Sequence, residues 1–129
     1  MGGVTATTAL KGKRILVVDD EPLVAMLVED LLSAAGAQVV GPAATLAEGL
    51  ALMCDAVPDG AVLDVNLDGV LVYPLAEALA GAGVPFVFVT GYGRLGVDPA
   101  FQGVTVLHKP LKLANFTNDV ANALGLSDG

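Results

Sequence analysis

Residues that could carry out chemistry follow four of the short apolar runs in this chain. They are Asp19, Asp20 and Glu21 after residues 15–18, Asp64 after 61–63, Thr90 after 86–89 and Lys109 near the end of 104–107. If these runs are parallel strands, their carboxyl ends meet at one edge of a sheet, where such sheets bind ligands. Several carboxylates, a hydroxyl and an ammonium would then share one cleft.

Carboxylates gathered in one cleft repel one another unless a cation lies among them. Two like charges about 4 Å apart repel by roughly 4 kcal/mol at an effective dielectric of about 20. Carboxylate and carbonyl oxygens are ligands suited to Mg²⁺, which often pairs with a phosphate. A carboxylate can attack phosphorus, and a lysine and a hydroxyl can stabilise phosphoryl oxygens. The set therefore predicts a phosphoryl-transfer site that uses Mg²⁺.

Each of these residues also has a purely structural interpretation. Acidic residues after a strand are often helix caps or favourable charges at a helix N-terminus, which could explain Asp19, Asp20 or Glu21 singly. Asp64 alone could be a turn residue, and Lys109 alone a solvated charge. The functional interpretation is favoured because separate strand ends supply complementary groups.

The elements that must position these residues alternate along the chain. Residues 38–40 form a brief additional apolar run, and helical spacing marks four segments: 22–36, one opening at Thr45, 72–82 and 113–125. Thr45 and Glu48 have the form of a capping box, with Cys54 further along the same helix as a core or boundary residue. Apolar strands that alternate with helices predict an α/β fold, with a parallel sheet covered on both faces.

The segment 91–99 interrupts this rhythm. It should hold a helix between the last two strands, but it contains Gly91, Gly93, Gly96 and Pro99. An interior glycine disfavours a helix by about 1 kcal/mol and an interior proline by about 3 kcal/mol. A short, frayed or absent helix is therefore expected here.

Length and composition fit one domain of 129 residues with a formal net charge of −8. The acidity argues against a nucleic-acid surface, and no apolar run suggests membrane insertion. A single Cys54 excludes an internal disulfide, and a cytoplasmic location is expected. We predict a flexible leader over 1–12, one domain over 13–125 and a tail over 126–129, whose last residues resemble a natural end.

Four motifs resemble the signatures of two-component response-regulator receiver domains, which are CheY-like. They are Val17-Val18-Asp19-Asp20-Glu21, Leu63-Asp64-Val65-Asn66-Leu67, Val89-Thr90-Gly91 and His108-Lys109-Pro110. The resemblance covers about residues 13–125. It implies a flavodoxin-like, doubly wound, five-stranded parallel sheet of order 2-1-3-4-5.

The resemblance also implies a role for each site residue. Asp64 would be the phosphoacceptor, and Asp20 and Asp64 would ligate Mg²⁺ with the backbone carbonyl of Asn66. Asp19 would act on the metal mainly through water. Thr90 and Lys109 would each contact a phosphoryl oxygen. A cis bond before Pro110 is common in the family.

One family feature is missing. Many receivers carry an aromatic switch residue three positions before the lysine, where this chain has Val106. The segment 85–93 instead resembles a receiver subgroup with a Phe-Ala-Thr-Gly-Tyr-like motif, although Val89 stands in place of its alanine. Tyr92 could then replace the missing switch, or could be a partly exposed loop aromatic.

These observations predict a stand-alone response regulator that is not an enzyme beyond its own phosphorylation and dephosphorylation. A sensor histidine kinase would donate the phosphoryl group, and the product would bind another protein or serve as a phosphate sink. Alternatives are a phosphorylation-independent binding module, a receiver cut from a larger regulator, a phosphatase or phosphotransferase, and a flavin-binding protein. His108 is interpreted as a surface or strand-end residue, and Leu111, Leu113 and Phe116 as core.

Overall fold

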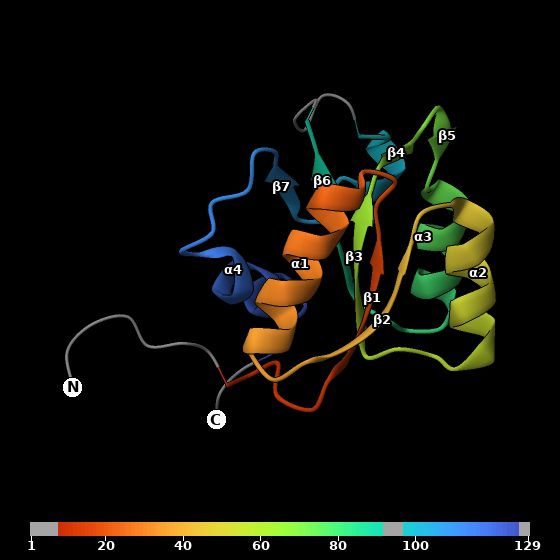
Figure 1. Ribbon diagram of the computed structural model, residues 1–129. Helices are drawn as coiled ribbons and strands as arrows, with labels where there is room; N and C mark the ends of the chain where they lie inside the picture. The colour runs from red at the N-terminus through yellow and green to blue at the C-terminus, as the bar shows by residue number, and fades with distance from the viewer. Residues whose placement is uncertain (1–7, 92–96, 127–129) are drawn as a thin grey trace, which may run out of the picture.

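A five-stranded parallel sheet forms the centre of the protein in the computed structural model, which describes residues 8–91 and 97–126 (Figure 1). Its strands are β1 (Arg14–Val18), β2 (Gln38–Ala43), β3 (Gly60–Asp64), β6 (Phe86–Thr90) and β7 (Val106–His108). They are ordered β2-β1-β3-β6-β7, and every neighbouring pair is parallel. This is the predicted order 2-1-3-4-5, so the flavodoxin-like fold class is confirmed.

Helices cover both faces of this sheet (Figure 1). α1 (Pro22–Ala34) and α4 (Phe116–Ala123) contact each other on one face, and α2 (Leu46–Asp55) and α3 (Tyr73–Gly81) do so on the other. Within β1, Ile15 and Val17 belong to the buried cluster that includes side chains of α1 and α4, called the α1/α4 cluster. Leu16 and Val18 belong to the cluster that includes side chains of α2 and α3, called the α2/α3 cluster. This explains why residues 15–18 of β1 are apolar at every position. Within the described residues, no helix is long and apolar enough to cross a membrane.

Thr45 caps the start of α2, as the sequence predicts, although Glu48 bonds to the residue before the cap rather than to the N–H of Thr45. The Thr45 hydroxyl accepts a hydrogen bond from the Glu48 backbone N–H at 3.1 Å, and the Glu48 carboxylate accepts one from the Ala44 N–H at 3.2 Å. These two bonds satisfy N–H groups that have no partner inside the helix. The cap fixes the start of the helix that follows β2.

Thr45→Ala is expected to destabilise the fold by about 1 kcal/mol, because the Glu48 N–H loses its side-chain acceptor. Urea unfolding followed by circular dichroism measures this change. Thr105→Ala, at an exposed position outside the helices, serves as the control and should change stability by less than about 0.5 kcal/mol. Equal effects of the two substitutions would contradict the capping assignment.

A hairpin that the sequence reasoning did not predict lies between β3 and α3. It consists of β4 (Asn66–Leu67) and β5 (Val70–Leu71), paired antiparallel. Its turn residues Asp68 and Gly69 have φ of 54° and 90°, and the Asn66 side-chain oxygen accepts a hydrogen bond from the Gly69 N–H at 2.6 Å. Asp-Gly is a strong signal for such a two-residue turn. The hairpin begins two residues after Asp64 and so borders the predicted site.

Between β6 and β7 the described residues contain a short 3-10 turn, η2 (Pro99–Phe101), and no α-helix. This agrees with the expected weak helix, although residues 92–96, including Tyr92, lie outside the described part. The turn is attached to α3. The Tyr73 ring stacks on Phe101 with centroids 5.2 Å apart, and its hydroxyl accepts a hydrogen bond from the Asp98 N–H at 2.8 Å.

The structure corrects several predictions about burial. Ala9 and Leu10 are buried in the α1/α4 cluster, so the packed unit begins before residue 13 and the leader is not loose to that point. Leu113 precedes α4 and is exposed, unlike half-buried Leu111 and buried Phe116. Cys54 is also exposed, because it lies on the outer side of α2.

Two strand boundaries also differ from the prediction. The strand around Val40 extends to residue 43, and the last strand begins at Val106 rather than at 104.

Candidate functional site

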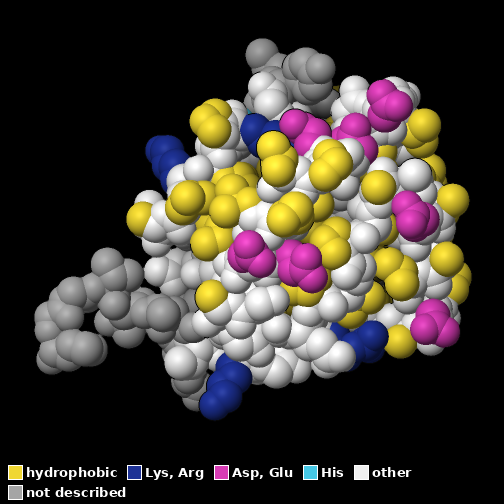
Figure 2. Space-filling model, in the orientation of Figure 1, with side chains coloured by type: hydrophobic (Ala, Val, Ile, Leu, Met, Phe, Trp, Pro, Cys, Tyr) yellow, Lys and Arg dark blue, Asp and Glu magenta, His cyan; other side chains and the backbone are white. Residues whose placement is uncertain are grey.

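The predicted site residues come together at the carboxyl ends of the strands. Asp64 and Thr90 are the last residues of β3 and β6, while Asp19 and Lys109 directly follow β1 and β7. The backbone N–H of Lys109 donates to the Thr90 carbonyl at 2.9 Å, so strand pairing sets these two residues side by side. Acidic side chains gather beside a basic one on this side of the molecule (Figure 2).

Lys109 lies among three carboxylates. Its ammonium nitrogen is 2.5 Å from Glu21 Oε1, 3.2 Å from Asp19 Oδ2 and 3.3 Å from Asp64 Oδ2. The Asp19 and Asp64 side chains are 5% and 7% exposed, whereas that of Glu21 is 58% exposed. Lys109 therefore links two buried acids and one solvated acid, which come from two different strand ends.

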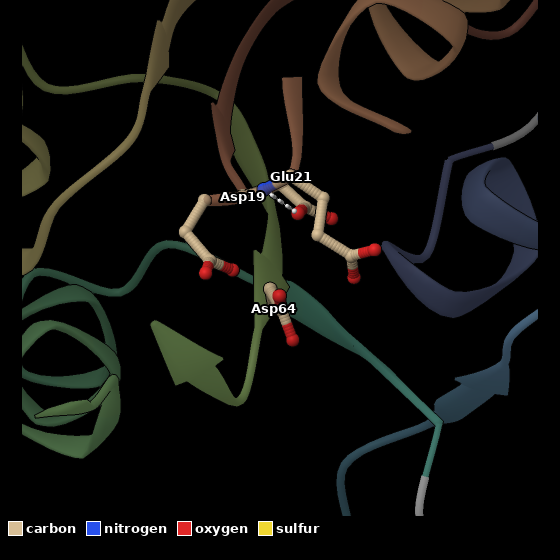
Figure 3. A group of neighbouring side chains, drawn as sticks. Asp19, Glu21 and Asp64 are labelled. Atoms are coloured by element: carbon tan, nitrogen blue, oxygen red, sulfur yellow. Dashed lines mark hydrogen bonds between the residues drawn. The ribbon is translucent and has the colours of Figure 1, made fainter. Parts of the chain in front are cut away.

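A hydrogen bond between a side chain and the backbone holds the loop after β1 in place. The Asp19 carboxylate accepts a hydrogen bond from the Glu21 backbone N–H at 2.9 Å, drawn as the dashed line in Figure 3. The side chains of Asp19 and Glu21 lie together with that of Asp64 in the same view. Pro22 begins α1 immediately afterwards, which ends the loop after Glu21.

Burial and charge shift the protonation of this cluster. Burial, together with the nearby Asp19 charge, raises the pKa of Asp64 from 3.8 to about 7, although Lys109 opposes the change. Burial also raises the pKa of Asp19 above its ordinary value. Burial would lower the pKa of Lys109, but its contacts with Glu21, Asp19 and Asp64 outweigh that effect and raise it. The ammonium thus stays charged while Asp64 titrates near neutrality.

The acidic side chains are close enough to share a cation. One oxygen each of Asp19, Asp20, Glu21 and Asp64 lies within 4.8 Å of the others. Asp20, Asp64, Asn66, Thr90 and the turn of the hairpin line a depression of about 290 Å³ beside them. The backbone N–H of Asn66 points to Asp64 Oδ1 at 3.4 Å. This arrangement of hard oxygen donors fits a divalent cation next to a phosphoryl group.

All the residues that the sequence analysis assigned to the site are therefore brought together: Asp19, Asp20, Asp64, Asn66, Thr90 and Lys109. The close contact of Glu21 with Lys109 was not predicted, although its position after two aspartates was a visible signal. Asp68 and Gly69 in the hairpin turn also border the depression. Val106 packs half-buried against the α2/α3 cluster, and the bond before Pro110 is cis. His108 is exposed at the end of β7.

The family model of the response regulator receiver domain matches residues 15–121 of this chain. The chain belongs to this family, as the motifs and the strand order both indicate.

Known proteins are similar to this chain in sequence and in structure. The chain is 31% identical over 118 residues to the phyllosphere-induced regulator PhyR of Methylorubrum extorquens, covering 85% of this chain and 43% of that protein. It thus spans less than half the length of that curated relative. The solution structure of SdrG from Sphingomonas melonis Fr1 is 43% identical, with a TM-score of 0.77, and the match covers 90% of this chain and 97% of SdrG.

A second SdrG structure, attributed to Pseudomonas melonis Fr1, is described as the BeF₃-activated conformation. It is 41% identical to this chain with a TM-score of 0.74, and the match covers 94% of this chain and 99% of that one. The likeness to SdrG therefore extends over almost the whole of both chains.

Proposed function

We propose that this chain is a response regulator whose Asp64 accepts a phosphoryl group from a sensor histidine kinase. The observation that carries the proposal is the position of Asp64, buried at the end of β3 with the Lys109 ammonium 3.3 Å away. Asp19, Asp20 and Thr90 surround the same carboxylate at neighbouring strand ends. Membership of the receiver family and the likeness to SdrG support this assignment.

The chemistry follows from the groups at the site. An Asp64 carboxylate oxygen forms a bond to phosphorus while the bond from phosphorus to the donor's leaving atom breaks. The Lys109 ammonium and the Thr90 hydroxyl stabilise phosphoryl oxygens as charge shifts during transfer. In dephosphorylation a water oxygen forms a bond to phosphorus while the bond from phosphorus to the Asp64 oxygen breaks, which releases inorganic phosphate and restores the carboxylate. Burial of Asp64 keeps bulk solvent away from the reacting oxygen.

We further propose that Mg²⁺ binds at the acidic cluster. Asp20 and Asp64 would hold it together with the backbone carbonyl of Asn66, and Asp19 would act mainly through water. When bound, the ion neutralises the repulsion among these carboxylates and the charge of the phosphoryl oxygens. The cluster of four acidic ligand atoms supports this assignment.

Mg²⁺ is expected to stabilise the folded protein, because binding relieves repulsion that the unfolded chain lacks. At about 100 times its dissociation constant the ion should add about 2.7 kcal/mol. Thermal melts with increasing MgCl₂, at constant ionic strength, measure the effect. Asp20→Asn should remove most of it, whereas Asp30→Asn, an exposed substitution on α1, should not. Equal stabilisation of all three proteins would contradict a site at Asp20.

Beryllofluoride binding tests the proposed function. In the presence of Mg²⁺ this phosphoryl mimic should shift the amide resonances of Asp64, Asn66, Thr90 and Lys109 in a ¹⁵N-labelled sample. Asp64→Asn should abolish these shifts, because the mimic bonds to a carboxylate oxygen. Shifts that persist in the variant, or that never occur, would contradict the assignment of Asp64.

The downstream step is proposed to be binding of another protein, or else loss of the phosphoryl group as a phosphate sink. The net charge of −8 disfavours direct contact with nucleic acid. Protein binding that is unaffected by beryllofluoride would favour the alternative of a phosphorylation-independent module.

A further inference from the structure

The exposed Glu21 contacts Lys109 more closely than either buried aspartate does. Its Oε1 atom is 2.5 Å from the ammonium nitrogen, compared with 3.2 Å for Asp19 and 3.3 Å for Asp64. Glu21 is the residue just before α1, and its backbone N–H donates a hydrogen bond to the Asp19 carboxylate. The contact joins loops that are 88 residues apart in sequence.

An ammonium group has three hydrogens to donate. In this structure three carboxylate oxygens surround it within 3.3 Å. A phosphoryl group on Asp64 would present further oxygens to the same ammonium. Once Asp64 is phosphorylated, its carboxyl group carries no charge of its own, and the negative charge that faces Lys109 lies on the phosphoryl oxygens. To donate to several of these oxygens, Lys109 must release Asp19 or Glu21, its other two partners.

Burial decides which partner leaves. The Asp19 side chain is nearly inaccessible to water, so an unpaired charge on Asp19 would be costly. The Glu21 carboxylate is 58% exposed and can be solvated as soon as Lys109 turns away. An exposed ion pair of this kind is weak, and its loss is tolerated.

Building on the proposed phosphoacceptor function, we propose that Glu21 is a positioning residue that competes with the phosphoryl group for Lys109. In the unmodified protein Glu21 occupies one ammonium hydrogen. Phosphorylation of Asp64 displaces this carboxylate into solvent, and the same ammonium N–H then donates its hydrogen bond to a phosphoryl oxygen. Glu21 thus opposes the phosphorylated state and lowers its stability.

The test is the affinity of the full chain for beryllofluoride at saturating Mg²⁺, with saturation established separately for each variant. Glu21→Gln should tighten binding about two- to fivefold, the range expected from an exposed ion pair. Glu77→Gln, an exposed substitution on α3, makes the same charge change away from the site and should leave the affinity unchanged. In a Lys109→Met background, Glu21→Gln should have no effect, since no ammonium remains to compete for.

The possible results distinguish a failure of this inference from a failure of the phosphoacceptor proposal. Weaker or unchanged binding by Glu21→Gln would overturn this inference alone, as would equal tightening in the Lys109→Met background or by Glu77→Gln. Failure of the unsubstituted chain to bind beryllofluoride would overturn the phosphoacceptor proposal, and this inference with it.

Discussion

Asp64→Asn is expected to raise the free energy of unfolding by about 2–4 kcal/mol near neutral pH in the absence of divalent cations. Burial and the Asp19 charge raise the pKa of Asp64 from 3.8 to about 7, so its ionised form is disfavoured in the folded state. A shift of that size corresponds to roughly 4 kcal/mol at most. Asparagine removes the charge but keeps the shape, and the melting temperature should rise by roughly 5–15 °C.

The stability gained by Asp64→Asn should depend on pH. A carboxyl whose pKa is raised by folding favours the folded state below its unfolded pKa, here 3.8, and that contribution is lost as pH rises through about 7. The advantage of Asp64→Asn should therefore be small near pH 4 and reach its full size above about pH 7. Urea unfolding of both proteins across this range measures it. A constant difference at every pH would contradict the raised pKa.

The exposed substitution Asp30→Asn is the matched control for the change in net charge. Its effect should stay within about 0.5 kcal/mol over the same range. Added Mg²⁺ should narrow the gap between wild type and Asp64→Asn, because the ion stabilises only the charged cluster. A gap that Mg²⁺ leaves unchanged would argue against a metal site at Asp64.

Lys109→Met is expected to slow phosphorylation by acetyl phosphate about 100-fold, because the reaction loses the cation that faces the phosphoryl oxygens. It should also lower stability by about 2 kcal/mol at neutral pH, since two buried carboxylates lose their partner. Phosphoprotein formation over time measures the first effect, and urea unfolding measures the second.

Two comparisons separate these effects from general damage. Lys112→Met replaces an exposed lysine further along the same loop and should change neither quantity appreciably. In an Asp64→Asn background, Lys109→Met should cost less stability, because one of the buried charges is already absent. A rate within about threefold of wild type would contradict the assigned role of Lys109.

Most of the fold could be predicted because local signals and global packing agree. The strand around Val17 is apolar on both sides since its alternate residues face two different helix layers. Thr45 and Glu48 predict the start of α2, where the Thr45 hydroxyl does accept a hydrogen bond from the Glu48 N–H. Hydrophobic periodicity and helix caps depend on residues that are neighbours in sequence, so they can be recognised in one amino-acid sequence.

The features that were missed depend on contacts between distant segments. The burial of Leu10 comes from its packing with the α1/α4 cluster, which a Gly- and Thr-rich leader does not reveal. Leu113 follows helical spacing, but the helix begins only at Phe116, so its side chain remains outside the core. Cys54 lies on α2 at a position facing solvent.

The candidate site was predictable as a set of residues because parallel strands bring their ends to one edge. The positions of Asp64 and Lys109 follow from that rule. Their contacts do not: the closest partner of Lys109 is Glu21, whose long side chain could have pointed into solvent. In the folded protein this side chain contacts Lys109 while it remains 58% exposed.

Intact mass after incubation with acetyl phosphate tests the central claim most directly. With Mg²⁺ the chain should gain one phosphoryl group, about 80 Da. It should gain none when the metal is chelated or when Asp64→Asn is used. Modification of the Asp64→Asn variant, or no modification of the wild type under conditions that phosphorylate a control receiver, would contradict the account.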